Sequence, residues 1–137
     1  MVIVKETISF DASLIYSTAR TGITLESILR YGDRSVTCEV KIDTGSTRCV
    51  FNRRYAEMLG LKVDSVEAEV MSTVTGAFKA YPHTIEIDVL GIRTESVVLF
   101  AADENFPRNV LGRVGWLDRV RLGVVDYEGK LLLSPYN

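Results

Sequence analysis

The stretch VKIDTGSTRCVF, residues 40–51, places a carboxylate at the end of a pattern that otherwise indicates a buried strand. Val40 and Ile42 alternate with polar residues, and Asp43 follows directly, at the start of a Thr-Gly-Ser turn. The chain becomes apolar again at residues 49–51. Burying an unpaired carboxylate costs free energy. The stretch therefore predicts two strands joined by a loop that holds Asp43 for a purpose other than packing.

Much of the chain alternates with the period of a β-strand. A hairpin is expected from residues 23–31 and 35–43, two runs that flank Gly-Asp-Arg. Its first run also has the spacing of a short helix, so both interpretations stay open there. Further strands are expected at residues 2–10, at 67–74, on both sides of a break at Leu90-Gly91 within 78–101, and in a C-terminal hairpin that turns at Glu128-Gly129.

Two short helices are expected among these strands. The first covers residues 52–60, where Asn52 is a suitable N-cap and Gly60 a suitable end. Its buried stripe is expected to consist of Tyr55, Met58 and Leu59. The second helix begins near Gly112, and its apolar stripe is Val110, Leu111, Val114 and Leu117.

Length and charge restrict the class of protein. A chain of 137 residues is predicted to form a single domain over residues 1–137, with a core of its own. The formal net charge is −2 and no basic run stands out, so neither nucleic acid nor a membrane surface is an expected partner. No apolar run approaches the roughly 20 residues that span a bilayer.

The N-terminus and the cysteines indicate a reducing compartment. Lys5 and Glu6 interrupt the N-terminal apolar residues, which does not fit a signal peptide, and a cytoplasmic location is expected. Cys38 and Cys49 would stay reduced there. They lie almost symmetrically about Asp43 and could be neighbours on a hairpin, but packing as two small hydrophobic side chains is favoured over a disulfide.

Several kinds of site lack the necessary residues. His83 is the one histidine, so a structural zinc site has too few ligands. A Ser-His-Asp or Cys-His arrangement would have to use His83, which fits better as an ordinary solvated histidine at a strand edge. No glycine-rich loop ends in Gly-Lys-Ser or Gly-Lys-Thr, which excludes the usual phosphate-binding loop. Carboxylates remain, and Asp43 is the one with unusual surroundings.

Four segments follow one another in an order that resembles the retropepsin-like, or retroviral-type, aspartic proteases. They are the Asp43-Thr44-Gly45-Ser46 loop after an apolar strand, a glycine-containing hairpin tip at residues 72–81, a strand pair at 84–101, and NVLGR at 109–113. The resemblance covers roughly residues 22–134 and leaves 1–21 as an N-terminal extension. Asp-Thr-Gly alone is weak evidence, and its combination with Val-Leu-Gly-Arg at this separation makes the match specific.

The resemblance implies an all-β acid-protease half-barrel with one or two short helices, and an active site on the two-fold axis of a homodimer. Peptide hydrolysis by carboxylates requires two of them about 3 Å apart that share a proton, an arrangement for which aspartic proteases are the standard example. This chain has one such loop, so the second carboxylate would come from a second copy of Asp43.

The family pattern also implies roles for the residues around Asp43. Thr44 corresponds to a position that hydrogen-bonds across the dimer axis. Gly45 corresponds to one that allows close approach of the paired loop, with its N–H turned toward the carboxylate. Ser46 could donate to Asp43 and favour its charged form, from which we expect an acidic activity optimum, or it could be a simple turn residue.

A flap is expected from the hairpin that follows. Thr75, Gly76, Ala77 and Phe78 would belong to this flap, which closes over the substrate and excludes water. Gly76 would lie near its tip, where the hairpin approaches a peptide backbone. The alternative is an ordinary surface turn.

Support for the Asp43 loop is expected from the segment near residue 110. Val110, Leu111 and Gly112 would pack under the loop, with Val110 near the substrate cleft. Arg113 is expected in a structural ion pair, and Trp116 in the core or at an interface.

These residues favour an aspartic endopeptidase that acts as a homodimer on an extended peptide or protein substrate, with no cofactor and no metal. The alternative is a peptide-binding or dimerisation module that has the same fold without proteolysis. A third interpretation, a β-domain in which Asp-Thr-Gly occurs by chance, is favoured least. The intact Asp-Thr-Gly-Ser string favours the enzyme, because a binding module has no need of a carboxylate pair.

Overall fold

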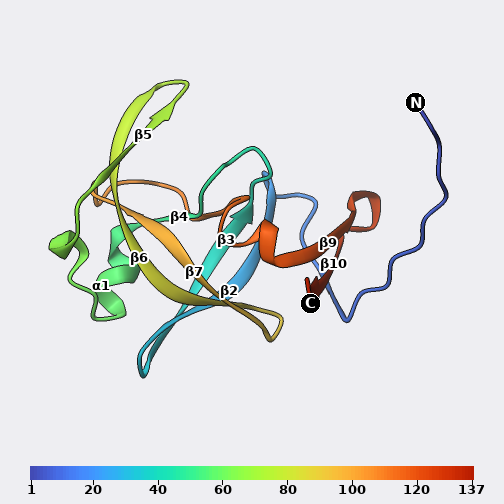
Figure 1. The fold of residues 1–137 in the computed structure, drawn as a ribbon, viewed down its shortest axis with the longest axis horizontal. Coiled ribbons are helices and arrows are strands. Elements are labelled where there is room, and N and C mark those ends of the chain that lie inside the picture. Colours follow the sequence, from blue (N-terminus) through green and yellow to red (C-terminus); the bar gives the residue numbers. More distant parts are fainter.

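The computed structural model describes residues 1–137 as two β-sheets with little helix (Figure 1). A seven-stranded sheet has the order β2-β3-β8-β4-β7-β6-β5, and a three-stranded sheet has the order β1-β10-β9. The strands are β1 (Ala12–Ile15), β2 (Ile23–Tyr31), β3 (Arg34–Ile42), β4 (Val50–Phe51), β5 (Glu69–Thr73), β6 (Gly76–Val89), β7 (Ile92–Ala101), β8 (Val110–Leu111), β9 (Val120–Val125) and β10 (Lys130–Pro135). This architecture confirms the all-β prediction.

The first predicted hairpin is formed by β2 and β3. The strands pair antiparallel from Ile23 opposite Ile42 to Tyr31 opposite Arg34, around a turn at Gly32. In β3, Cys38 and Val40 are buried, and the residues that alternate with them, Thr37, Glu39 and Lys41, are exposed, as the pattern predicts. The first arm is therefore a strand, and the short helix that its spacing also allowed is wrong.

The strands β6 and β7 form the long hairpin expected around residue 90. They pair from Ala80 opposite Ala101 to Val89 opposite Ile92, and the turn uses positive φ at Leu90 and Gly91, which confirms the predicted break. Between Gly76 and Lys79, however, β6 pairs with β5 alone, because its pairing with β7 begins only at Ala80. The β5–β6 hairpin consequently projects from the body (Figure 1).

The helix α1 (Arg53–Met58) begins and ends close to its predicted limits. The Asn52 side chain accepts a hydrogen bond from the backbone N–H of Arg54, and Gly60 follows the helix with a φ of 77°. Tyr55 and Leu59 are buried as predicted. Met58 was predicted wrongly, since it is 56% exposed and Ala56 is buried in its stead. Positions 55, 56 and 59 share one helix face, and position 58 lies off it.

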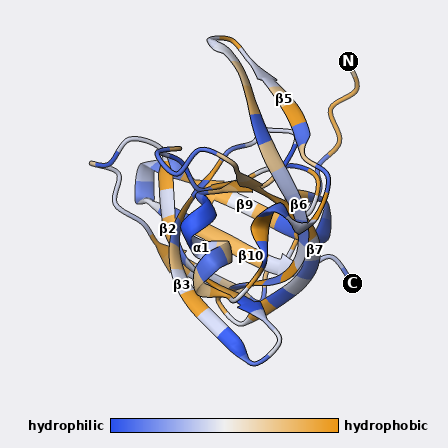
Figure 2. Ribbon diagram, turned by 90° about the vertical axis from the view of Figure 1, so that its left-hand side faces the viewer, coloured by the Kyte–Doolittle hydropathy of each residue, from blue (hydrophilic) through white to orange (hydrophobic).

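Two predicted elements are absent. No helix begins near Gly112, where β8 is followed by irregular chain and one 3-10 turn, Leu117–Arg119. The backbone N–H of Arg113 bonds instead to the loop after β3, so the segment is held in a different conformation. Residues 2–10 form no strand, because no other segment of the chain pairs with them. Most of them run apart from the body, with hydrophobic colour near the terminus (Figure 2), whereas the Phe10 ring lies against Gly123.

The core joins the two sheets. One cluster of 21 buried apolar residues includes Phe51 and Phe100 from the large sheet and Leu131 and Leu133 from the small one. Trp116 is fully buried within this cluster, in agreement with one of its two predicted places. The C-terminal hairpin is also confirmed, with β9 and β10 paired around a turn that ends at Gly129. None of the helices is long and apolar enough to cross a membrane.

The two cysteines are free and buried, as predicted. Burial raises the pKa of the Cys38 thiol to about 12 and that of the Cys49 thiol to about 11. We therefore expect iodoacetamide at pH 8 to label neither cysteine in the folded protein and both in urea, because the thiolate is the reactive species. Mass spectrometry of labelled samples measures this. A Thr84→Cys variant, labelled at an exposed site, verifies that the reagent is active. Rapid labelling of native Cys38 or Cys49 would contradict the buried placement.

Candidate active site

Asp43 lies directly after β3, in a loop that orients its carboxylate by main-chain contacts. The backbone N–H of Gly45 donates to Asp43 Oδ1 at 3.0 Å, and the N–H of Ser46 donates to the Asp43 carbonyl at 3.1 Å. The Asp43 side chain is neither buried nor fully exposed. The predicted orientation of the Gly45 N–H is confirmed, and one carboxylate oxygen is thereby fixed while the group stays accessible.

A second segment, far along the chain, holds this loop. The strands β3 and β8 pair in parallel, and the Asp43 N–H donates to the Leu111 carbonyl at 3.0 Å. Past the ends of these strands, the Arg113 N–H donates to the Ser46 carbonyl at 2.8 Å. The loop is therefore fastened on both sides of its turn by backbone hydrogen bonds.

Gly112 sits at the centre of this contact. A Cβ placed there would lie 2.3 Å from the carbonyl oxygen of Arg48 and 2.6 Å from that of Ser46. Side chains do not fit at such distances from backbone oxygens, so only glycine permits the approach. The Gly112 N–H also donates to Cys49 Sγ at 3.4 Å. These contacts agree with the expectation that residues 110–112 pack under the Asp43 loop.

A groove of about 390 Å³ lies between the Asp43 loop and the β5–β6 hairpin. The four residues expected in a flap, Thr75, Gly76, Ala77 and Phe78, all line it. Its other lining residues are Asp43, Ser46, Val50, Thr73, Phe106, Pro107, Arg108 and Val110. The predicted residues Thr44, Gly45, Leu111 and Gly112 are not part of the lining. Their place is in the loop itself and beneath it.

The hairpin over the groove has a tight tip and a fastened base. Gly76 has a φ of 141°, a backbone conformation that favours glycine, and Thr73 Oγ1 donates to its carbonyl at 2.8 Å. At the base, Arg48 Nη1 donates to Glu69 Oε1 at 3.1 Å, which links the strand start to the segment after the Asp43 loop. The tip has no such link, so the geometry allows the tip to move while the base stays fixed.

The wall opposite the hairpin was not predicted from the sequence. It is the loop at residues 103–109, and a buried amide holds it: Asn52 Nδ2 donates to the carbonyls of Glu104 and Phe106 at 3.0 and 2.9 Å. Asn109 Oδ1 accepts the Asn52 N–H at 2.9 Å. The sequence indicated Asn52 only as a helix cap. The one local signal for this wall is the apolar Phe106-Pro107 pair inside an otherwise polar loop.

Two side chains near Asp43 differ from their predicted contacts. The Ser46 hydroxyl donates to the Arg48 carbonyl at 2.7 Å and not to the carboxylate, because the turn brings that carbonyl closer. The acidic optimum inferred from a Ser46–Asp43 bond thus loses its structural basis. Arg113 is exposed and belongs to none of the ion pairs, so the predicted structural ion pair is wrong. Its backbone, not its guanidinium, carries the contact with the loop.

Thr44 and His83 lie in different surroundings. Thr44 is exposed and forms no hydrogen bond within the chain, and its role across a dimer axis stays a prediction. His83 is half-buried, with Nε2 2.8 Å from the Val63 carbonyl. It is therefore more enclosed than the solvated histidine that we expected, and it does not line the Asp43 groove.

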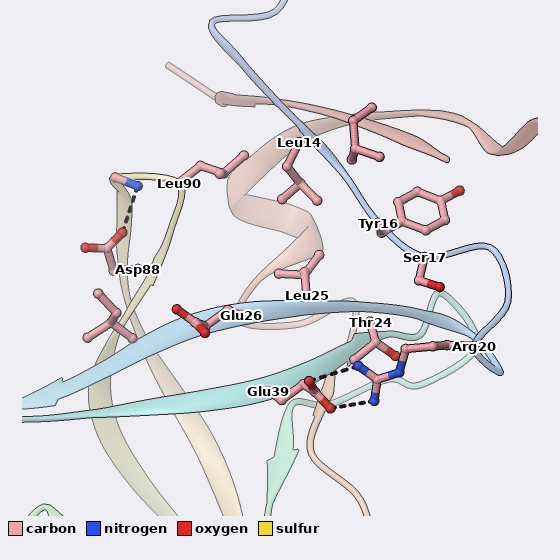
Figure 3. Close-up of a pocket in the computed structure, with 13 residues that line it drawn as sticks. Leu14, Tyr16, Ser17, Arg20, Thr24, Leu25, Glu26, Glu39, Asp88 and Leu90 are labelled. Carbon is pink, nitrogen blue, oxygen red and sulfur yellow. Dashed lines mark hydrogen bonds and ion pairs between the residues drawn. The ribbon is translucent and has the colours of Figure 1, made fainter. Parts of the chain in front are cut away.

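A second hollow, of about 550 Å³, lies between β1, the start of β2 and the β6–β7 turn (Figure 3). It shares no residue with the Asp43 groove. Most of its charged groups are engaged: Arg20 pairs with Glu39 at 2.6 Å, and Asp88 accepts from the Gly91 N–H at 2.9 Å and pairs with Arg30. The groove beneath the hairpin is the better candidate for chemistry, because its carboxylate, Asp43, is held on a loop that backbone hydrogen bonds fasten.

Comparisons with known proteins agree with this choice. A family model described as "Aspartyl protease" matches residues 29–114, a span that contains both the Asp43 loop and the segment fastened to it. Among solved structures, a retropepsin-like aspartic protease from Rickettsia conorii is 19% identical with a TM-score of 0.63, over 90% of this chain and 99% of that one. EIAV protease in complex with the inhibitor HBY-793 is also 19% identical, with a TM-score of 0.54, over 66% of this chain and 80% of that one. These two structures confirm the predicted fold. No curated protein sequence matches the chain.

The contact at Gly112 gives a stability prediction. Gly112→Ala should lower the free energy of unfolding by about 2–3 kcal/mol, because backbone atoms of the Asp43 loop must move away from the new methyl group. Gly123→Ala is the matched control, since neither glycine has a positive φ and the Cβ at position 123 meets the far end of a side chain, the Phe10 ring, at 2.9 Å in place of backbone oxygens. We expect a loss below about 1 kcal/mol there. Urea unfolding measures both variants, and equal losses would contradict the fastening role of Gly112.

Proposed function

This chain belongs to the aspartyl protease family, and from that premise we propose that it is an endopeptidase whose active site forms between two copies of the chain. The observation that carries the proposal is the placement of Asp43. Its carboxylate is held by a main-chain hydrogen bond, on a loop that is fastened from below, at the floor of a groove covered by a hairpin. The sequence contains Asp-Thr-Gly once.

The need for a second copy follows from the groove itself. Asp43 is the only acidic residue that lines it. Activation of water and polarisation of a peptide carbonyl require a base and an acid at the same time. Two carboxylates that share one proton supply both, since like charges at close distance do not both ionise. A two-fold axis beside Asp43 brings two equal loops together and completes the pair.

The reaction then proceeds with defined proton movements. The ionised carboxylate accepts a proton from water as the water oxygen attacks the carbonyl carbon, and the protonated carboxyl donates to the carbonyl oxygen. Collapse of the tetrahedral gem-diol breaks the C–N bond: the carboxyl that took up the water proton donates it to the leaving nitrogen, and one gem-diol hydroxyl returns its proton to the other carboxylate, so that the pair again shares one proton. The Gly45 N–H keeps Asp43 Oδ1 in place during these steps.

The substrate is an extended peptide or protein segment. The walls of the groove include the apolar side chains of Val50, Phe78, Phe106 and Val110, which suit apolar substrate side chains. An extended peptide beneath the β5–β6 hairpin can form main-chain hydrogen bonds with it. Closure of the hairpin tip removes water from the reacting atoms.

A binding module without proteolysis is the second candidate. It is favoured by the fact that one chain presents a groove with a single carboxylate, which is enough to bind a peptide and not enough to cleave it. The two candidates differ in what happens when Asp43 loses its charge. Proteolysis requires the carboxylate, whereas peptide binding requires only the groove walls.

Removal of the carboxylate tests the proposed chemistry. Asp43→Asn preserves the shape of the side chain, and we expect it to reduce cleavage of a peptide library by about a thousandfold or more, because the base and the acid are both lost. Asp33→Asn, at the exposed β2–β3 turn, is the matched control and should cleave like the parent. Unchanged cleavage by Asp43→Asn would refute the proposal.

Mixing the parent with Asp43→Asn tests whether two chains share the site. If each dimer needs two Asp43 residues, only dimers of two parent chains are active. After subunit exchange, an equimolar mixture should then have about a quarter of the activity of the same total amount of parent protein. If each chain works alone, about half remains. The remaining rate is read from a peptide-cleavage assay over a series of mixing ratios. A linear dependence on the parent fraction would exclude a shared site.

Dilution provides an independent test of the same point. The specific activity should fall as the protein concentration drops below the dissociation constant of the dimer, because monomers lack the second carboxylate. Sedimentation analysis over the same concentrations gives the fraction of dimer. The two curves should coincide, and full specific activity in a monomeric sample would contradict the proposal.

A further inference from the structure

The Asp43 groove contains one cation, Arg108. Of the residues that line the groove, only Asp43 and Arg108 carry a charge. Arg108 forms no ion pair, and its guanidinium donates no hydrogen bond within the chain. Arg48, on the segment after the Asp43 loop, is by contrast paired with Glu69 at 3.1 Å. The groove therefore offers an incoming peptide a guanidinium whose donors are still free.

The loop that carries Arg108 is braced from beneath by Asn52 and, within the groove, by an aromatic contact with the hairpin. Asn52 holds the carbonyls of Glu104 and Phe106, and the ring of Phe106 lies 5.0 Å from that of Phe78, centroid to centroid. Pro107, which directly precedes Arg108, has a fixed φ. The backbone under Arg108 is consequently held in place, and it carries Arg108 among the residues that line the groove.

The charge of the proposed carboxylate pair determines what Arg108 can contribute to substrate binding. Two carboxylates that share one proton have about one negative charge, which disfavours an acidic side chain in the same groove. A nearby guanidinium offsets that repulsion and can bind a carboxylate through two parallel hydrogen bonds. Nothing else that lines the groove could do so.

On the basis of the proposed function, we propose that Arg108 determines specificity by selecting substrates with an acidic side chain close to the scissile bond. In a two-fold dimer, each copy contributes one Arg108, so an acidic residue is accepted on either side of the bond. The apolar walls then accommodate the remaining side chains. The preferred substrate is a mixed sequence of apolar and acidic residues, not a wholly apolar one.

Peptides that differ only in Glu versus Gln test the inference directly. The two side chains have nearly the same shape, so the ratio of kcat/KM values for the Glu and Gln peptides reports charge alone. Glutamate is placed in turn at each of the three positions on either side of the bond. We expect the parent to favour Glu about fivefold at one or more of these positions, the range of a partly exposed ion pair. The preference should decrease at high salt, and it should fall as the pH drops through about 4, where the substrate carboxylate becomes protonated.

Variants at position 108 connect this preference to the arginine. Arg108→Gln should bring the Glu/Gln ratio to about one or below, and Arg108→Glu should invert it and favour Lys peptides. Arg108→Lys retains the charge and should restore part of the preference. The matched control is Arg34→Glu, which changes an exposed, unpaired arginine at the β2–β3 turn and should leave the ratio as in the parent. A ratio is insensitive to the amount of folded protein, and three variants ensure that one folding failure does not decide the test.

The outcomes separate the inference from the proposed function. Cleavage by the parent with no preference for Glu at any position, or with a preference that Arg108→Gln and Arg108→Glu leave intact, would overturn the inference and leave the endopeptidase in place. A parent that cleaves no peptide at any pH would refute the endopeptidase and the inference with it. A Glu preference that disappears with the charge at position 108 supports both.

Discussion

The arrangement of this protein around Asp43 depends on one close contact between backbones. Gly112 meets the carbonyl oxygens of Ser46 and Arg48 at distances that no side chain would allow, and the parallel pairing of β3 with β8 brings it there. The Asp43 loop is therefore shaped by main-chain atoms. This explains why the Ser46 hydroxyl is free to cap the Arg48 carbonyl and why the Arg113 side chain is left in solvent. Neither side chain is needed to hold the carboxylate.

The two walls of the groove differ in how firmly they are attached. The loop at residues 103–109 is held by the buried amide of Asn52, which also caps α1 and so couples this wall to the core. In the β5–β6 hairpin, the part between Ala80 and the tip has only the pairing between its own two strands. Elements with few contacts open at low free-energy cost, whereas buried hydrogen-bonded ones do not. The groove thus has one wall that is held by the core and one that is fastened at its base.

Local sequence patterns predicted the parts of the fold that local physics determines. The β2–β3 and β9–β10 hairpins, the break at Leu90-Gly91 and the Asn52 cap each depend on a few neighbouring residues, and each was predicted correctly. The helix predicted near Gly112 and the strand predicted at residues 2–10 are absent, because contacts with distant segments determine the secondary structure at these places. The first segment is drawn into backbone contacts with the Asp43 loop, and the second finds no strand to pair with. The wall formed by the loop at residues 103–109 could not be predicted for the same reason, since Asn52, which holds it, lies more than fifty residues earlier in the chain.

If the site is completed only when two folded copies meet, as proposed, electrostatics gives a reason for this order. In one copy, Asp43 is partly exposed and accepts a hydrogen bond from the Gly45 N–H, so water and the main chain both stabilise its charge. A chain that carried both carboxylates of a pair would have to overcome their repulsion during folding. With one carboxylate per chain, that repulsion arises only when two folded copies meet. In the proposed dimer, the shared proton relieves this repulsion when the two loops meet, and on the same proposal one copy by itself lacks the second carboxylate that the chemistry requires.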